Sequence, residues 1–509
     1  SGPSGGQVML SELCITRCNY PDSKADLFAM FIERNLDLVA KQGAVGMITM
    51  QSWMFLSSYE KLRANLLNNK TLVTMAHLGP RAFDSIGGEV VSTTAFVFES
   101  AQQRERKGDY LRLVDGSSEA EKDRMIREAI RNRDCGWYHR AASADFQKIP
   151  GGPIAYWISQ KILATFEEPS LGDVIITEGQ NKTADNSRFA RLIWEVNCDH
   201  VGRDRKWLEY AKGGSFRKWY GNIEHVVDWS PEARSHYRRD SSCRIVDDRF
   251  WYLEGITWTD ITSGGTSFRY LPSETTFDMS GPTAFFEHRE SIEKYLCLLN
   301  SQYTRQLLPL INPTLHAQLR DIKAIPMLRA ASDKAGLAEL AKTCISLAKE
   351  DWDSYEQSLR FKAHPFVESK CAEPTLSKKY LELRNYWTEK TKELQCFEEK
   401  NNCIFIDAYG LQDELTPDVP LAEITLTCNP HYRYSGDKSE QELEDLLRGD
   451  TMREFISYAV GCMFGRFSLD KPGLILANQG ETLEDYLRQV PEPRFTPDAD
   501  NVIPLLDGD

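Results

Sequence analysis

The residue types best suited to chemistry with a nucleic acid lie in residues 201–239, where cations alternate with aromatic rings. This stretch holds 9 Lys and Arg against 5 Asp and Glu, a net charge of +4, in a chain whose net charge is −14. Cations neutralise phosphate groups, and rings stack on bases or pack under sugars. The pattern predicts phosphate contacts, with a solvated surface over an aromatic core as the alternative. The cations expected to contact phosphate are Lys206, Arg217, Lys218, Arg238 and Arg239.

A second pair of residues is suited to reading bases. Arg269 and Tyr270 follow the turn residues Gly264, Gly265 and Thr266 and begin a strand-like segment. Arginine is the side chain best suited to a bidentate contact with guanine in a groove. We therefore predict that Arg269 and Tyr270 contact DNA. The alternative is that Arg269 pairs with an acidic neighbour such as Glu274 and that Tyr270 belongs to the core.

Helices and strands that would position these residues can be read from the hydrophobic periodicity. Residues 23–41 and a stretch beginning at Ser57 have helical spacing, whereas residues 44–50, 71–78 and 90–98 are strand-like apolar runs. We expect residues 44–50 to form a central strand buried on both faces, with Trp53 packed at its end. A charged residue in place of Ile48 would then destabilise the domain by several kcal/mol, in the range of about 2–7 kcal/mol for an unpaired buried polar group. The order of elements predicts part of a Rossmann-like α/β sheet.

The rest of the chain divides by composition. Residues 99–140 are charged and predicted helical, and Pro150, Gly151, Gly152 and Pro153 mark a boundary. A β-rich, turn-rich region follows, with one helix over residues 292–310. Residues 332–399 are predicted helical, and the acidic end is predicted to hold a strand at 424–427 and helices at 439–447 and 451–464. We predict an α/β + α+β multidomain fold with boundaries at 1–148, 149–330 and 331–509.

Composition excludes several classes of protein. The chain has 509 residues, 41% hydrophobic and 27% charged, which is typical of a globular protein and not of a disordered one. Residues 401–509 hold 8 Lys and Arg and 21 Asp and Glu, a net charge of −13. Twelve cysteines without a zinc-type spacing predict small buried side chains in a reducing, cytoplasmic setting, and no metal site. No apolar run is long enough for a membrane span, and residues 1–6 (SGPSGG) are typical of a cloning scar or a cut edge.

Signatures of an independent catalytic centre are also missing. Methylation of a base amine needs a glycine-rich turn after a strand, and a polar-Pro-Pro-aromatic loop that holds the amine. The chain shows no such turn near its start. The nearest match to the loop is Asn429-Pro430-His431-Tyr432, which we interpret as a strand-end turn. We expect no catalytic or cofactor-binding residue, and that this chain alone neither binds S-adenosylmethionine tightly nor methylates DNA.

The chain nevertheless resembles a known family in the order of its segments. Residues 23–34 (SKADLFAMFIER) and 46–63 (GMITMQSWMFLSSYEKLR) are similar to the stretch just downstream of the catalytic loop in PglX-like proteins, the adenine-specific DNA methyltransferases of BREX phage-defence systems. These are related in layout to type IIG restriction-modification enzymes. Residues 149–157 (IPGGPIAYW) resemble that family's passage from methyltransferase to target-recognition region. Residues 258–272, 299–326 and 452–470 resemble later segments of the family.

The resemblance implies a parent protein that methylates adenine at N6 in duplex DNA with S-adenosylmethionine. The family's cofactor turn and catalytic loop lie upstream of the segments that match, so we predict a chain that lacks this N-terminal catalytic half. It would keep a partial methyltransferase sheet, a β-rich target-recognition domain and a helical, acidic C-terminal domain. Its predicted partners are double-stranded DNA and other defence proteins, and no membrane. The alternatives are a noncatalytic interaction subunit of a defence complex and an unrelated enzyme.

Overall fold

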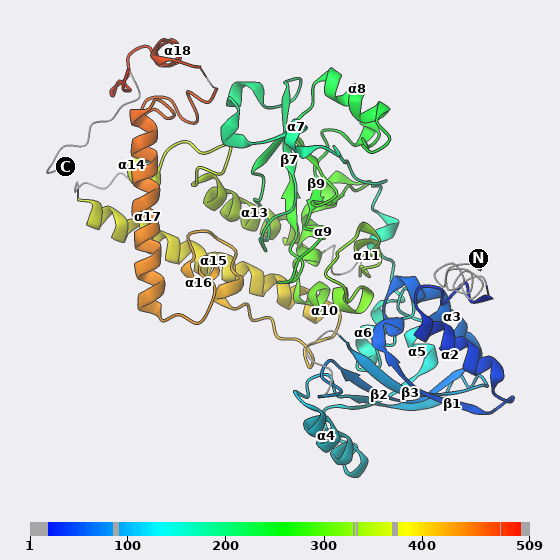
Figure 1. Cartoon of the computed structure of the whole chain (residues 1–509). Helices are drawn as coiled ribbons and strands as arrows, with labels where there is room; N and C mark the ends of the chain where they lie inside the picture. Colours follow the sequence, from blue (N-terminus) through cyan, green and yellow to red (C-terminus); the bar gives the residue numbers. More distant parts are fainter. Residues whose placement is uncertain are drawn as a thin grey trace, which may run out of the picture. The chain divides into compact units, whose positions relative to one another are not determined.

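The computed structural model describes residues 19–84, 91–328, 331, 334–368, 375–478 and 480–499. Figure 1 shows a mixture of helices and small sheets. The residues group into two compact units. Unit 1 comprises residues 1–170, 306–314 and 324–326, and unit 2 comprises residues 171–305, 315–323 and 327–509. Among the described residues no helix is both long enough and apolar enough to cross a membrane.

Unit 1 is built on one mixed five-stranded sheet in the order β1-β3-β2-β4-β5. β3 runs antiparallel to β1 and β2, β4 runs parallel to β2, and β5 runs antiparallel to β4. β1, β2 and β4 therefore point in the same direction. The strands are β1 (Ala44–Met50), β2 (Thr71–Gly79), β3 (Thr93–Glu99), β4 (Lys107–Arg112) and β5 (Tyr138–Ala142).

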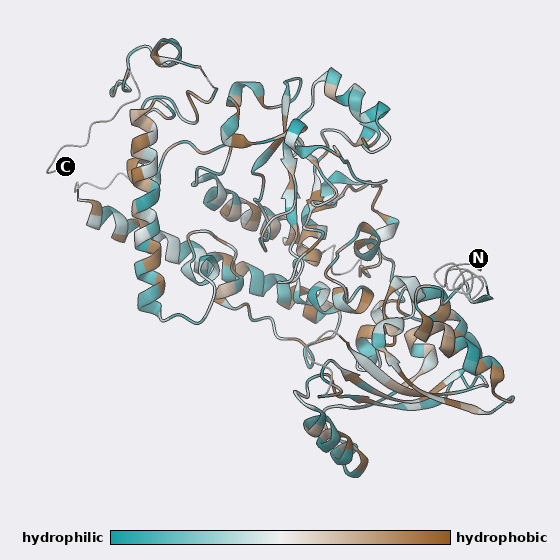
Figure 2. Ribbon diagram, viewed as in Figure 1, coloured by the Kyte–Doolittle hydropathy of each residue, from teal (hydrophilic) through white to brown (hydrophobic). Residues whose placement is uncertain are grey.

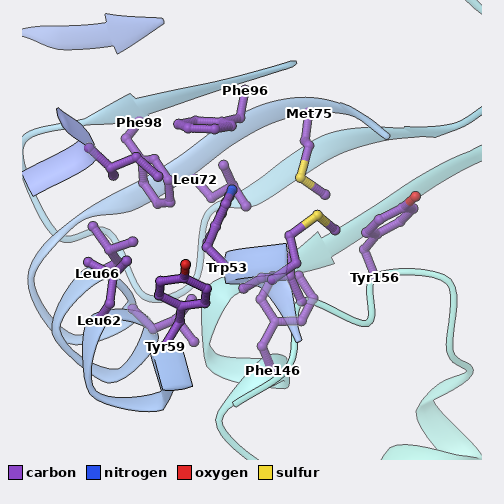
Figure 3. Packing of buried hydrophobic residues seen from close by; sticks show 14 of the residues in the cluster. Trp53, Tyr59, Leu62, Leu66, Leu72, Met75, Phe96, Phe98, Phe146 and Tyr156 are labelled. Atoms are coloured by element: carbon purple, nitrogen blue, oxygen red, sulfur yellow. The ribbon is translucent and has the colours of Figure 1, made fainter. Parts of the chain in front are cut away.

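One face of this sheet is covered by helices. The helices of the unit are α2 (Leu27–Leu38), α3 (Glu60–Asn69), α4 (Glu119–Arg131), α5 (Ser143–Phe146) and α6 (Gln160–Thr165), with short 3-10 turns at Gln51–Met54 and Ser57–Tyr59. Trp53 lies at the centre of the core, with its ring 5.1 Å from Phe96 and 5.8 Å from Phe98 (Figure 3). Leu62 and Leu66 of α3 complete this layer. The predicted packing of Trp53 after the first strand is confirmed.

The predicted burial of β1 on both faces is wrong. Exposure alternates along the strand, and Ile48 and Met50 are 60% and 38% exposed. β1 lies at the edge of the sheet, and within the described part of the chain it pairs with β3 alone. Its apolar residues point to both faces, but only one face is covered. Figure 2 shows hydrophobic segments along the strands of this sheet. The uncovered face is a shallow apolar groove of about 390 Å³ lined by Gly46, Ile48, Ala76, Ala95 and Val97, among others.

Residues 99–140 differ from the predicted helical stretch. They contain β4 and most of β5 besides the single helix α4. Charged residues on β4 hid its strand character, because Lys107 and Asp109 interrupt the apolar pattern, whereas Tyr110 is fully buried. The three strands predicted from the earlier apolar runs are confirmed in type, and their bounds shift by at most three residues.

The Pro-Gly turn at residues 150–153 lies inside unit 1 and is fixed by a buried arginine. Arg63 donates from Nε to the carbonyl oxygen of Gly151 at 2.9 Å and from Nη1 to that of Trp53 at 3.0 Å. Burial lowers the pKa of Arg63 to about 10. Gly151 and Gly152 have φ values of +79° and +58°, which side chains with a Cβ rarely adopt. Arg63 therefore ties this turn to α3 and to the segment after β1, inside unit 1.

Unit 2 has two small sheets and a helical part. One sheet has the order β11-β7-β8-β6 and the other β10-β9-β12. The strands are β6 (Ala190–Leu192), β7 (Trp207–Ala211), β8 (His225–Asp228), β9 (Gly255–Thr257), β10 (Arg269–Leu271), β11 (Thr275–Phe277) and β12 (Thr283–Ala284). The short helices between them are α7 (Asn186–Phe189) and α8 (Pro231–Arg239). This agrees with the predicted β-rich, turn-rich region.

The helical part corrects several bounds. The predicted helix 292–310 is two helices, α9 (Ile292–Leu299) and α10 (Gln302–Ile311), and the predicted pair at 439–464 is one helix, α17 (Glu440–Met463). No strand forms at residues 424–427, where a 3-10 turn at Leu421–Glu423 leads into a loop. The other helices are α11 (Leu319–Lys323), α13 (Leu337–Asp353), α14 (Pro365–Glu368), α15 (Leu376–Ala408), α16 (Pro430–Arg433) and α18 (Leu483–Gln489).

By compactness, the β-rich region and the acidic helical region form a single unit. The division into three regions at 148/149 and 330/331 stays a prediction about function. The grouping has a physical cause, because buried ion pairs join residues near 217 to residues near 351 and 398. Two of the predicted DNA-contacting residues, Arg217 and Lys218, belong to these ion pairs.

Candidate functional site

Three of the predicted DNA-contacting cations lie at the surface around α8. Ser230 caps this helix with its hydroxyl, which accepts from the Ala233 N–H, and Pro231 occupies the first turn. Arg238 and Arg239 lie in the last turn, and Lys206 lies in the loop before β7. All three side chains are exposed. The Arg238 guanidinium lies 5.4 Å from the Trp251 ring centre, and the Lys206 ammonium lies 5.0 Å from that of Trp207.

Two further cations that the sequence analysis did not single out join this surface. The Arg203 guanidinium lies 4.9 Å from the Tyr252 ring centre, and that of Arg234 lies 5.1 Å from Trp251. Both belong to the cation-rich stretch 201–239, so its composition contained the signal, whereas the rings come from a later turn. We call this set the α8 surface. Among the described residues, none of its cations pairs with a carboxylate; they are Arg203, Lys206, Arg234, Arg238 and Arg239.

Arg217, by contrast, is buried at 4% exposure. Its Nη1 lies 3.2 Å from Asp351 Oδ2 of α13, and its Nη2 donates to Thr427 Oγ1 at 2.6 Å. The guanidinium also lies over the rings of Trp352 and Tyr432. Sequence reasoning could not foresee this, because the partners lie more than 130 residues further along the chain. A guanidinium held in this way does not reach a DNA backbone.

Lys218 is buried as well, at 7% exposure. Its ammonium forms an ion pair with Glu398 of α15, whose other carboxylate oxygen accepts from the Trp219 indole at 2.8 Å. Burial raises the pKa of Glu398, although Lys218 and Trp219 act in the opposite direction. Lys218 and Trp219 thus attach the loop after β7 to the long helix α15.

Arg269 is 1% exposed and donates to the Arg217 carbonyl oxygen at 3.2 Å and to Thr259 Oγ1 at 3.3 Å. Burial, together with the charge of Arg217, lowers its pKa to about 10. It does not use Glu274, which is exposed. Tyr270 is half-buried, and burial and a hydrogen bond to Glu254 raise its pKa. Arg217, Lys218 and Arg269 were expected at a surface that faces DNA; the structure instead buries all three in internal contacts.

The Asn429-Pro430-His431-Tyr432 segment begins a helical turn. Asn429 is 1% exposed and caps α16, accepting from the His431 N–H, while its amide donates to the carbonyl oxygens of Leu421 and Ile424. The Tyr432 hydroxyl donates to the Phe216 carbonyl oxygen. Every polar group of this segment that could hold a base amine is thus engaged in local structure. The interpretation as a turn holds, but a 3-10 turn and a loop precede it instead of a strand.

A polar cluster in unit 1 was missed by sequence reasoning. Gln51 follows β1, His77 lies near the end of β2, and Arg112 is the last residue of β4. Because these strands run in the same direction, the three residues share the carboxyl edge of the sheet, which is where open α/β sheets bind ligands. His77 Nε2 donates to Gln51 Oε1 at 2.7 Å, and its Nδ1 accepts from the Tyr156 hydroxyl at 3.1 Å. Burial lowers the pKa of His77 to about 4, so the imidazole is neutral near pH 7.

Aromatic rings border this strand-end cluster. The ring centres of Phe55 and Trp157 lie 6.0 Å apart, and both lie about 6 Å from that of His77. The Arg112 guanidinium lies 5.9 Å from the Trp157 ring centre. Phe55 and Trp157 remain partly exposed. The cluster therefore offers ring faces beside neutral hydrogen-bonding groups, which suits a planar heterocycle. Trp157 ends the segment 149–157 that was predicted as a domain boundary, so the sequence there contained a signal for this cluster.

A cofactor site of the methyltransferase type does not fit the described residues of unit 1. β1, β2 and β3 lead into Gln51, Pro80 and Ser100, and none of these starts a glycine-rich turn. Without such a turn the backbone cannot approach the sugar and methionine parts of S-adenosylmethionine. We therefore assign the cofactor none of the described residues of unit 1.

Comparison with known proteins connects these features. Residues 12–83 match the Eco57I restriction-modification methylase family. The chain is 35% identical over 514 residues to the adenine-specific methyltransferase BrxX of Escherichia coli O9:H4 (strain HS), covering 99% of this chain and 41% of BrxX. It is 35% identical over 511 residues to the adenine-specific methyltransferase PglX of Lacticaseibacillus casei (strain Zhang), covering 96% of this chain and 40% of PglX.

Among solved structures, the type IIL restriction-modification enzyme MmeI in complex with DNA aligns over 86% of this chain and 53% of its own, at 10% identity and a TM-score of 0.43. The type ISP enzyme LlaGI, with a DNA substrate mimic, aligns over 66% and 39% at a TM-score of 0.38. The sequence matches place the chain among relatives of DNA methylases. More specifically, its resemblance to PglX-like adenine-specific methyltransferases is confirmed. The chain spans about two fifths of the length of these curated relatives.

Proposed function

We propose that this chain supplies the DNA target-recognition part of a site-specific N6-adenine DNA methyltransferase of a phage-defence system. The observation that carries the proposal is the α8 surface, where four exposed cations and the half-buried Arg234, all without carboxylate partners among the described residues, lie near three aromatic rings. Such a surface suits phosphates and sugars. S-adenosylmethionine and the catalytic loop would belong to a part of the protein outside these 509 residues. The identity to BrxX and PglX supports the proposal.

The test is a titration of the chain on duplex DNA at several salt concentrations. Each lost phosphate contact lowers the salt slope of log K by about 0.9. We expect Arg238→Ala and Lys206→Ala to weaken binding to all duplexes alike and to lower the slope. Arg488→Ala is the matched control, because Arg488 is an exposed arginine that pairs with Asp485 on α18. Unchanged binding by both test variants would contradict the proposal.

A second role follows for unit 1. We propose that the strand-end cluster faces the adenine that is turned out of the duplex. Support comes from the position at the carboxyl edge and from the partly exposed rings of Phe55 and Trp157. Extrusion costs less from a mismatch, so the parent chain should bind a duplex with a mismatched adenine more tightly than a matched one.

The variants Phe55→Ala and Trp157→Ala should lose this preference and keep the salt slope. Phe31→Ala, which removes an exposed ring from α2, is the control. If the preference persists in both test variants, the cluster does not contact the base, although duplex binding through the α8 surface stands.

The alternative role, a noncatalytic interaction subunit, is favoured by the acidic residues 401–509 with a net charge of −13. If the unmutated 509-residue chain shows no salt-dependent DNA binding, this alternative is favoured over DNA target recognition. Excess acidic residues in one region suit a basic protein partner.

A further inference from the structure

At the end of α8 three side chains with metal-binding atoms converge. His236 lies in the last turn of the helix, Asp240 is its C-cap, and Cys243 follows in the next turn. Their ligand atoms all lie within 4.8 Å of one another, and all three side chains are partly buried. A nitrogen, an oxygen and a sulfur are the donors that zinc prefers in proteins. This trio belongs to neither the α8 surface nor the strand-end cluster.

The separation between His236 and Asp240 suits a shared ion better than a direct hydrogen bond. His236 Nε2 lies 3.7 Å from Asp240 Oδ2, which is too long for a hydrogen bond. Two ligands of one tetrahedral zinc ion, with bonds of about 2.0–2.3 Å, lie roughly 3.3–3.6 Å apart. Small side-chain shifts would therefore bring the three atoms to bonding distance of one ion.

The surrounding structure holds the ligands in place. The main chains of Lys182 and Arg244 exchange two hydrogen bonds of 2.8 Å, and the Cys243 thiol donates a hydrogen bond to the Thr183 carbonyl oxygen at 3.0 Å. Asp240 Oδ1 accepts from Ser242, which leaves Oδ2 directed to the histidine. The His236 ring packs against Phe189 at 5.1 Å. The carbonyl end of a helix also carries partial negative charge, which favours a cation.

We propose that His236, Asp240 and Cys243 bind one zinc ion, with water in the fourth tetrahedral position. The ion would join the end of α8 to the segment at Thr183, and so fix the helix turn that carries Arg238 and Arg239. Zinc would displace the Cys243 thiol proton, which would pass to solvent, and the resulting thiolate and the Asp240 carboxylate would balance the charge of Zn²⁺. The proposal does not depend on DNA binding.

The first test measures metal in the whole 509-residue chain. After exposure to ZnCl₂ and removal of free metal by dialysis, we expect one zinc per chain by elemental analysis. Cys243→Ser and His236→Ala should each bind zinc about tenfold or more weakly. The controls are Cys198→Ser, a half-buried cysteine that donates to the Leu474 carbonyl oxygen, and His288→Ala, an exposed histidine. Both controls should bind zinc like the parent.

A second measurement uses the unmutated chain, so its outcome does not depend on whether a variant folds. Cobalt(II) added to the parent chain should give a thiolate-to-cobalt charge-transfer band and the visible bands of tetrahedral coordination, and zinc should displace them. Zinc should also raise the melting temperature of the parent. If cobalt gives no thiolate band, or if Cys243→Ser retains the full zinc content and the same band, the proposal is overturned.

Discussion

Buried polar side chains are held differently at residues 217 and 218 of unit 2 and around Arg63 and His77 of unit 1. Unit 2 buries complete ion pairs, Arg217 with Asp351 and Lys218 with Glu398, between segments far apart in the sequence. Unit 1 buries Arg63 against carbonyl oxygens and keeps His77 neutral between Gln51 and Tyr156. The ion pairs of unit 2 create a fixed framework, whereas in unit 1 the neutral His77 ring is held between Gln51 and Tyr156. Buried ion pairs thus hold the fold of unit 2, and in the strand-end cluster the groups that a ligand can reach are the partly exposed rings of Phe55 and Trp157.

The largest expected effect breaks the framework of unit 2. Glu398→Gln removes the charge that partners Lys218 and leaves a buried ammonium without a carboxylate. Breaking a buried pair in this way costs about 3–5 kcal/mol of unfolding free energy. Denaturant unfolding measures the loss. The double variant Lys218→Met/Glu398→Leu should recover part of it, because apolar residues of similar size replace both charges, although the Trp219 indole loses its acceptor. Equal stability of the single variant and the parent would show that the pair does not hold the unit together.

The second effect depends on pH and belongs to unit 1. The pKa of His77 is lowered to about 4 by burial, against about 6.5 in an unfolded chain. Between these values the unfolded state binds a proton that the folded state does not. Stability is therefore complete above pH 6.5 and falls as the pH drops towards 4, by at most about 1.4 kcal/mol per pH unit for one histidine.

His77→Gln should flatten this dependence, as measured by denaturant unfolding at pH 4.5 and 7.5. His364 in unit 2 has a pKa that burial lowers to about 4 as well, so some pH dependence should remain. His288→Ala, at an exposed site, should leave the dependence unchanged. An unaltered slope in His77→Gln would mean that this side chain is not buried in its neutral form.

A smaller effect concerns the uncovered face of unit 1. Ile48→Asp should change the unfolding free energy by less than about 1 kcal/mol, because the side chain is 60% exposed. Met75→Asp, at 1% exposure on the covered face, should cost several kcal/mol, within about 2–7 kcal/mol for an unpaired buried polar group. Melting curves of the two variants test this difference. A large loss from Ile48→Asp would indicate that the face is covered in solution.

The smallest effect separates the framework from DNA binding. The double variant Lys218→Met/Glu398→Leu should bind duplex DNA with the salt slope of the parent, because a buried ammonium releases no counterions. A titration at three salt concentrations measures this. A slope lowered by about 0.9 would show that Lys218 reaches a phosphate after all.

Local patterns predicted the first three strands of unit 1, because strands such as β2 and β3 follow their apolar periodicity, but they missed β4 and β5 in the charged residues 99–140. The same periodicity predicted β1 as a central strand, although it lies at the edge of the sheet. A strand with apolar residues on both faces has the same sequence pattern in either position. The relationship to adenine-specific methyltransferases was predicted from the resemblance of whole segments to that family, not from local patterns. In the candidate site, the sequence located Lys206, Arg238 and Arg239 at the surface but could not separate them from Arg217 and Lys218. Exposure there is decided by Asp351 and Glu398, which no local pattern connects to residues 217 and 218.

The free edge of β1 has a consequence for work with this chain at high concentration. An edge strand of seven uncharged residues, without proline, offers its backbone as a template for another strand. Within the described part of the chain, β1 contains no lysine and its register with β3 shows no bulge. We expect copies to associate edge to edge as concentration rises, so that light scattering grows before unfolding begins. A lysine in place of Ile48 would act as a gatekeeper and keep the protein dispersed without altering its fold.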